Sequence, residues 1–157
     1  MDTKLETTAS GARDRLLAGI PVRERRLDLA GVSTFLLEGG DGPPLVLLHG
    51  PGAYAAAWQR VLPALAESYS VVAPDLPGHG ASTTDGPLDA DRVIAWLDEL
   101  IARVCPTPPV VVGQLVGGAI ALRHAAAYPE QVERLVLVVP FGLAPFEPPP
   151  AFGAALG

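Results

Sequence analysis

The fold is decided by one stretch of the chain, Val110-Val111-Val112-Gly113-Gln114-Leu115-Val116-Gly117-Gly118-Ala119-Ile120-Ala121-Leu122. Three β-branched residues run into a glycine, two further glycines follow a tight turn, and helix-forming residues come next. This order predicts a buried strand that turns sharply into a helix. Gly113 and Gly117 would let the helix pack close against the strand, because glycine has no side chain to hold the two backbones apart.

The glycine spacing in this turn is that of a nucleophile elbow, Gly-x-Ser-x-Gly, in which a strained turn presents a reactive serine. Here Leu115 stands where the serine would be. A serine triad needs an oxygen that a histidine can deprotonate, and leucine offers none. The central residue of an elbow also tends to adopt a positive φ, which is unfavourable for a bulky side chain. We therefore predict an elbow kept for packing, without a nucleophile.

Length and charge restrict the classes of protein to be considered. The chain has 157 residues, 49% of them hydrophobic, which is enough for one domain with a buried core. A net charge of −6 without a basic patch argues against nucleic-acid binding. Six of the eleven Lys and Arg residues, Arg13 among them, lie within the first 26 positions. Acidic residues are interleaved with them, so we expect a solvated face there and no anion site.

The sequence carries no signal for membrane insertion or export. No apolar run approaches the ~20 residues needed to span a bilayer, and the N-terminus lacks the apolar region of a signal peptide. Cys105 is the only cysteine, which excludes an intrachain disulfide and a thiolate metal cage. These observations predict a cytoplasmic protein with no membrane, nucleic-acid or metal partner and no cofactor.

Strand and helix patterns alternate along most of the chain. Residues 22–29 and 32–37 flank Ala30-Gly31, a turn signal that predicts a β-hairpin. Asp89 is a suitable N-cap for an apolar helix that Pro106 ends. The other predicted elements are strands at 45–48, 70–73, 110–112 and 132–139, and helices at 10–20, at 53–68 with a kink or break at Pro63, and from the elbow to about 128.

This alternation predicts an α/β fold with a mostly parallel sheet, helices on both faces and an N-terminal β-hairpin. In such sheets ligands bind at the carboxyl ends of the strands. His49-Gly50, Asp75 and Gln114-Leu115 each follow a strand, so we expect all three on one rim of the sheet. The predicted organisation is a polar segment with a short helix over 1–21, the sheet core over 22–140, and a proline-rich tail that begins a cap or linker over 141–157.

The motifs that follow these strands resemble those of the α/β-hydrolase-fold superfamily. The resemblance extends over residues 22–145 and is carried by Leu47-Leu48-His49-Gly50-Pro51-Gly52, Trp58, Ala73-Pro74-Asp75-Leu76-Pro77-Gly78-His79-Gly80-Ala81-Ser82 and Val112-Gly113-Gln114-Leu115-Val116-Gly117-Gly118. It corresponds to the N-terminal half of such a domain. The resemblance places the catalytic acid and histidine after later strands, so we expect a domain truncated after its sixth strand with neither residue present.

The resemblance also implies roles for individual residues. Leu115 fills the nucleophile position, Val116 would supply one oxyanion N–H, and His49 would brace the oxyanion loop. Pro51 departs from the pattern because proline has no N–H, and Gly52 would replace that donor only if the loop shifts by one residue. The candidate residues are His49, Gly50, Pro51, Gly52, Gln114 and Val116 at the pocket, Asp75, Gly78 and Gly80 in a structural turn, and Gly113, Gly117 and Gly118 in the elbow.

Other reactive side chains are better explained by structure. Cys105 follows a helix at the amino end of the sheet, so we interpret it as a structural thiol. Ser82 has no base beside it and is expected to form a hydrogen bond within its turn. His79 is interpreted as structural and His124 as a surface or packing residue, and no histidine pair has metal-ligand spacing.

Three hypotheses follow. The first is a member of the family that resembles serine ester or C–C-bond hydrolases, with an incomplete catalytic set and no activity on its own. The second is a non-catalytic protein that binds a small hydrophobic molecule, because Leu115, Val116 and Pro51 make the pocket floor apolar. The third is a non-serine enzyme whose base lies on a C-terminal half. A parallel sheet that ends after its sixth strand also predicts self-association through the exposed edge.

Overall fold

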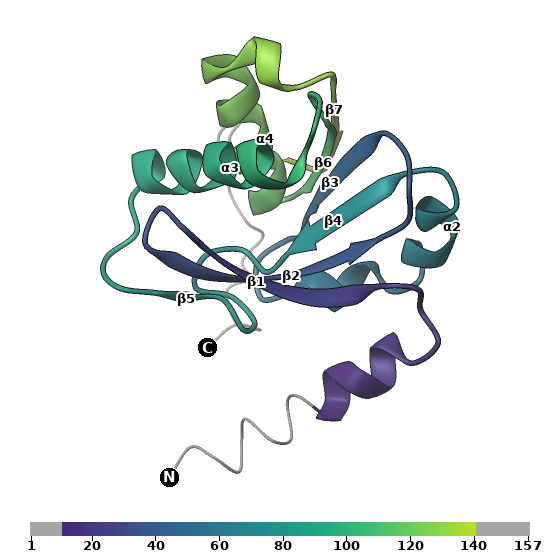
Figure 1. The fold of residues 1–157 in the computed structure, drawn as a ribbon. Helices are drawn as coiled ribbons and strands as arrows, with labels where there is room; N and C mark the ends of the chain where they lie inside the picture. Colours follow the sequence, from purple (N-terminus) through teal and green to yellow (C-terminus); the bar gives the residue numbers. More distant parts are fainter. Residues whose placement is uncertain (1–10, 141–157) are drawn as a thin grey trace, which may run out of the picture.

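A single sheet organises residues 11–140, which are the residues described by the computed structural model (Figure 1). The predicted polar segment 1–9 and the tail 141–157 lie outside the described residues, and the predicted helix at 10–20 is present at 11–17. The elements that follow are β1 (Arg23–Leu29), β2 (Val32–Gly39), β3 (Pro44–Leu48), η1 (Ala55–Trp58), α2 (Leu62–Ala66), β4 (Ser70–Pro74), β5 (Thr83–Thr84), α3 (Ala90–Val104), β6 (Val110–Gln114), α4 (Val116–Ala127), η2 (Pro129–Gln131) and β7 (Arg134–Val138).

The sheet has seven strands in the order β1-β2-β4-β3-β6-β7, with β5 paired to β2. Strands β4, β3, β6 and β7 run parallel to one another, and β2 pairs antiparallel with β1, β4 and β5. The predicted α/β fold with an N-terminal hairpin is therefore confirmed. Strand β5 was not predicted, because two threonines form a strand only where β2 supplies the partner.

Helices cover both faces of the sheet. Successive residues of β3 point to opposite sides, so Val46 and Leu48 join a cluster with α3 and α4, while Leu45 and Leu47 join a second cluster with η1 and α2. Figure 1 shows α3 and α4 together on one side of the sheet. This double burial explains why β3 is apolar along its whole length.

The two long predicted helices differ in how well their sequences define them. Helix α3 begins as predicted, with the Asp89 side chain accepting a hydrogen bond from the Arg92 N–H at 2.8 Å. The helix expected over 53–68, with a kink or break at Pro63, is divided into η1 and α2, and the division comes before Pro63. Pro63 lies in the first turn of α2, where a missing N–H breaks no helical hydrogen bond.

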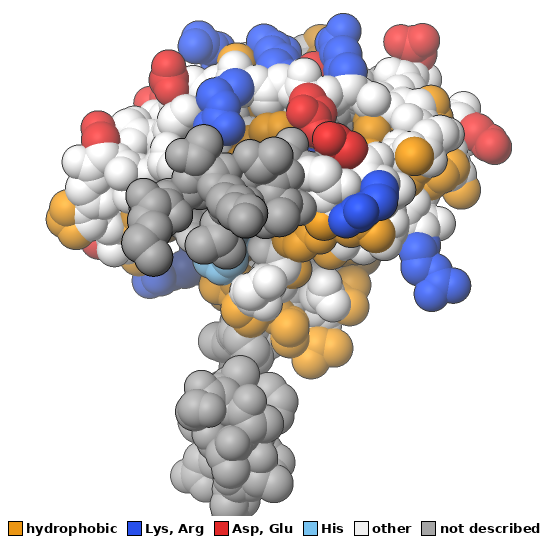
Figure 2. Space-filling view, turned by 90° about the horizontal axis from the view of Figure 1, so that it is seen from below, with side chains coloured by type: hydrophobic (Ala, Val, Ile, Leu, Met, Phe, Trp, Pro, Cys, Tyr) orange, Lys and Arg blue, Asp and Glu red, His pale blue; other side chains and the backbone are white. Residues whose placement is uncertain are grey.

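Strand β7 forms one edge of the sheet and presents an apolar surface. Val136 and Val138 are 39% and 41% exposed, and both are on the sheet face that carries Val112. Figure 2 views the molecule from below, and hydrophobic side chains gather in the lower part of that view.

Among the described residues, no helix combines the length and hydropathy that crossing a bilayer requires.

Candidate functional site at the carboxyl end of the sheet

The structure brings the three predicted motifs to one rim. Strand β3 lies between β4 and β6, and all three run parallel, so the residues that follow them emerge side by side. His49-Gly50 follows β3, Asp75 follows β4, and Leu115 follows β6. The rim is therefore built from three loops that are distant in sequence, with His49 and Leu115 66 positions apart.

The elbow holds Leu115 in a strained conformation. Leu115 has φ of 50° and ψ of −114°, as expected for the central residue of an elbow. A non-glycine residue in such a region costs about 1–3 kcal/mol and persists only where its surroundings enforce it. Here the absence of side chains at Gly113 and Gly117 allows the close backbone packing that holds this conformation. A Cβ on Gly113 would be 2.5 Å from the Gly117 oxygen, and one on Gly117 would be 2.6 Å from the His49 oxygen.

The Leu115 side chain packs against the loop that follows β3. A Cβ built on Gly50 would lie 3.1 Å from Leu115 Cδ1 and 3.5 Å from its Cβ. Leu115 is half-buried, and its backbone N–H donates to the Val138 oxygen at 3.0 Å. The position of a nucleophile is thus occupied by a hydrocarbon side chain that covers Gly50.

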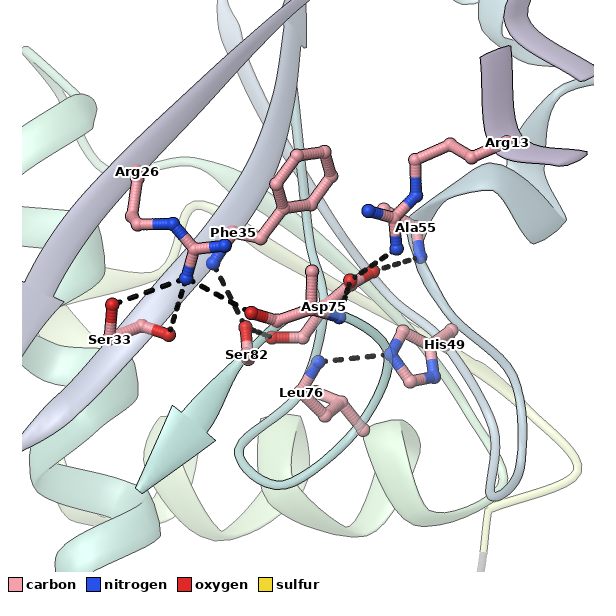
Figure 3. Close-up of polar contacts among 10 residues, drawn as sticks. Arg13, Arg26, Ser33, Phe35, His49, Ala55, Asp75, Leu76 and Ser82 are labelled. Atoms are coloured by element: carbon pink, nitrogen blue, oxygen red, sulfur yellow. Dashed lines mark hydrogen bonds and ion pairs between the residues drawn. The ribbon is translucent and has the colours of Figure 1, made fainter. Parts of the chain in front are cut away.

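His49 joins the loops that follow β3 and β4. Its Nε2 accepts the Leu76 N–H at 2.9 Å, so the ring proton is on Nδ1, which donates to the Gly50 oxygen at 2.7 Å (Figure 3). The side chain is fully buried, and this burial lowers the pKa of the imidazole from its usual value near 6.5. With both nitrogens engaged, His49 braces the loop and is not free to take a proton from a nucleophile.

The Asp75 carboxylate organises the rest of the rim. It is fully buried and accepts the Ala55 N–H at 2.6 Å on Oδ1 and the Ala81 N–H at 2.7 Å on Oδ2. The bond to Ala81 lies within the turn that Asp75 begins. The bond to Ala55 ties this turn to η1, which comes after the loop that follows β3.

Arg13 is a third partner of Asp75 that was not predicted. Its Nη2 donates to Asp75 Oδ2 at 3.0 Å, and the guanidinium carbon is 4.2 Å from the centre of the Phe35 ring (Figure 3). The prediction that Arg13 belongs to a solvated face is wrong, since its side chain is only 15% exposed. The helix at 11–17 packs on the second hydrophobic cluster through Leu17 and carries Arg13 to the rim.

The turn after Asp75 depends on its glycines and on Ser82. Gly78 and Gly80 have φ of 74° and 56°, and a Cβ on Gly80 would be 2.5 Å from the carboxylate carbon of Asp75. The Ser82 hydroxyl donates to the Asp75 backbone oxygen at 2.8 Å and accepts the Phe35 N–H at 2.9 Å. Ser82 is therefore a buried turn residue and not a nucleophile.

The backbone N–H groups at this rim come from the loop that follows β3 and from the start of α4. Pro51 and Gly52 are exposed, and Gly52 has φ of 69° with open space around its Cα. Ala53 donates to the Gly50 oxygen at 3.3 Å, which closes the loop as a turn. Val116 begins α4, so its N–H is one of the four that an α-helix leaves without an internal partner. Pro51, in the loop that follows β3, has no backbone N–H to donate.

The remaining candidates lie away from a reactive arrangement. We expected His124 to be a surface or packing residue, and the structure shows that it is fully buried. Its Nε2 is 3.4 Å from Asp98 Oδ1 on α3. Burial lowers the pKa of His124. His79 contacts the oxygen of Pro77 through Nδ1 at 3.1 Å. Cys105 ends α3, and burial raises the pKa of its thiol to about 12, which keeps it protonated and unreactive.

The sheet order, the elbow after β6 and the His-Gly loop after β3 define a hydrolase-type α/β domain. Residues 43–157 match the family described as alpha/beta hydrolase fold, and the chain belongs to this family.

The relatives include esterases and C–C-bond hydrolases. The chain is 39% identical over 99 residues to pimeloyl-[acyl-carrier protein] methyl ester esterase from Aeromonas hydrophila, covering 63% of this chain and 38% of that protein. It is 39% identical over 131 residues to 2-hydroxymuconate semialdehyde hydrolase from Pseudomonas sp. strain CF600, covering 76% of this chain and 44% of that protein. The solved 2-hydroxy-6-oxo-6-phenylhexa-2,4-dienoate hydrolase from Rhodococcus sp. strain RHA1 has a TM-score of 0.77 at 31% identity, over 86% of this chain and 52% of that one. The chain spans less than half the length of these two curated relatives.

Proposed function

We propose that this chain is a hydrolase-family protein that retains the shape of the catalytic rim and does not carry out serine-type hydrolysis on its own. The observation that supports this most directly is the Leu115 side chain in the nucleophile position, in contact with Gly50. Hydrolysis of an ester or a C–C bond by this fold needs a deprotonated oxygen at that point. Leu115 has no oxygen to offer.

The histidines of the described residues support the same conclusion. His49 uses both ring nitrogens within the rim, and His124 is paired with Asp98 between α3 and α4. His79 contacts its own loop. A hydroxyl introduced at position 115 would therefore have no base to activate it.

An activated ester tests this proposal. Wild type, L115S and L115A are incubated with p-nitrophenyl butyrate, and we expect all three to release p-nitrophenol at the rate of buffer alone. L115A is the matched control, because it removes the same side chain without adding a hydroxyl. Faster release by L115S than by L115A would contradict the proposal. Turnover that is equal in wild type and L115A, and above the buffer rate, would instead favour a non-serine enzyme.

A second candidate function is the binding of a small hydrophobic molecule at the same rim. It is supported by the exposure of Pro51 and the partial exposure of Leu115 and Val116, which together present apolar side chains at the carboxyl end of the sheet. Titration with methyl hexanoate, followed by the methyl signals of Leu115 and Val116 in NMR spectra, tests it. We expect saturable shifts at both residues in the wild type and no shift at Val116 in L115D. Shifts confined to Val136 and Val138 would contradict this function.

A further inference from the structure

A hollow lies at the end of the sheet opposite to Leu115. It has a volume of about 530 Å³ and is bordered by Ser70, the first residue of β4, and by Val104, the last residue of α3. Helix α3 ends at this hollow, β1 begins there at Arg23, and β2 ends there at Gly39. None of the rim residues lines this hollow.

Arginine side chains dominate the charge around the hollow. Arg23 and Arg25 come from β1 and Arg103 from the last turn of α3, while the acidic residues of the lining are Glu38 and Asp41. Three positive charges therefore face two negative ones, in a chain whose formal net charge is −6. This excess of positive charge lies on one concave surface, where its electrostatic potential acts most strongly on small anions.

Glu38 holds two of these guanidinium groups in place. It accepts a hydrogen bond from Arg23 Nε at 3.1 Å on Oε2 and from Arg25 Nη1 at 3.0 Å on Oε1. The Glu38 side chain is only 11% exposed, so its carboxylate is largely shielded from solvent. Each guanidinium has five N–H donors and gives one to Glu38, which leaves the others available. Fixed guanidinium groups lose less conformational entropy when they bind a ligand.

Arg103 is the third positive group, and it makes no ion pair within residues 11–140. Its position in the last turn of α3 lets its charge interact favourably with the C-terminal end of the helix dipole. Loss of Arg103 would therefore change stability a little, apart from any change in binding. A test must read ligand binding separately from the unfolding temperature.

We propose that this hollow is a binding site for a small organic anion, one that carries a carboxylate or phosphate group between Arg103 and the Arg23–Arg25 pair. Guanidinium groups bind both kinds of oxyanion through paired N–H···O bonds. The volume falls within the range of roughly 300–1,000 Å³ that small-molecule sites occupy. The site is separate from the rim that follows β3, β4 and β6, so this proposal stands independently of the proposed function.

Two titrations test the proposal, one with inorganic phosphate and one with succinate, each at constant ionic strength maintained with potassium chloride. Binding is followed by the backbone amide signals of residues 39–41 in NMR spectra. The R103Q variant removes one wall of the site, and R123Q is the matched control, because Arg123 is also an exposed arginine on a helix and lies outside the hollow. Unfolding temperatures of both variants are measured without ligand to establish that they fold.

We expect saturable shifts at residues 39–41 with at least one of the two anions, and the tighter one identifies the preferred oxyanion. R103Q should weaken that binding about tenfold, which corresponds to one charge-assisted hydrogen bond, and R123Q should leave it unchanged. Absence of saturation with both anions would overturn the proposal. Equal weakening in R103Q and R123Q would also overturn it, since that result is expected of non-specific screening.

Discussion

The guanidinium of Arg13 and the carboxylate of Asp75 are 62 positions apart in sequence and 3.0 Å apart in the structure. This ion pair fastens the helix at 11–17 to the loop that follows β4. Because Asp75 also accepts N–H groups from Ala55 and Ala81, the N-terminal helix is connected to η1 and to the turn at Gly80 through one carboxylate.

Replacement of Arg13 by alanine should destabilise the protein by about 2 kcal/mol, the range for a hydrogen bond to a charged group. The loss is expected because Asp75 stays buried with one donor fewer. Urea denaturation of R13A gives the change in the free energy of unfolding. R15A is the control, because Arg15 is exposed on the same helix, and its effect should stay within about 0.5 kcal/mol. Equal effects of the two variants would mean that the ion pair contributes nothing.

Glycine at position 115 should be tolerated better than alanine. Both substitutions remove the contact with Gly50, but only glycine adopts φ of 50° and ψ of −114° without strain. We expect L115G to have a free energy of unfolding about 1 kcal/mol higher than L115A, at the lower end of the cost of such a conformation. The comparison uses urea denaturation of the two variants. A lower stability of L115G would show that Leu115 is not strained in solution.

Lysine at position 138 should reduce self-association. Residues 135–139 are all apolar, they lie at the edge of the described sheet, and an unpaired edge without charges invites strand pairing with a second copy. Sedimentation velocity over a range of concentrations should show less association for V138K than for wild type. The control is V61K, because Val61 is 43% exposed and lies outside the sheet. The expectation fails if V61K and V138K behave alike.

Stability should fall as the solution becomes acidic, in part through His124. Burial lowers the pKa of His124 in the folded chain below the value of 6.5 expected when it is unfolded. The unfolded chain therefore binds more protons below about pH 6.5, and the free energy of unfolding decreases as the pH falls through that region. H124Q should reduce this dependence by up to one proton, or about 1.4 kcal/mol per pH unit. R123Q, one residue away, should retain the wild-type slope, and an unchanged slope in H124Q would contradict the assignment.

The parts of this fold that the sequence predicts are those set by short-range pattern. The glycines at 113 and 117 predict the elbow, because Gly113 lies too close to α4, and Gly117 too close to the end of β3, for either to carry a side chain. Asp89 predicts the start of α3 through its own N-cap hydrogen bond. Apolar runs predict β3, β4 and β6, and their shared direction brings the three motifs to one rim.

The parts that the sequence does not predict depend on contacts between distant segments. Arg13 is surrounded in sequence by other charges, and only the packing of its helix shows that it reaches Asp75. Strand β5 exists through its pairing with β2. The one available signal for Arg13 was Asp75 itself, since a carboxylate directly after a buried strand requires a positive partner or several N–H donors.

The hydrogen bonds of His49 have a consequence for how this rim responds to change. His49 fixes two loops to each other through Leu76 and Gly50, and neither bond involves the side chain at position 115. The nearest neighbours of a Cβ built on Gly113 or on Gly117 are likewise backbone atoms. The architecture of the rim is therefore maintained by groups other than the one that would react. In this fold, a protein can lose its chemistry by a single substitution and keep the scaffold around it intact.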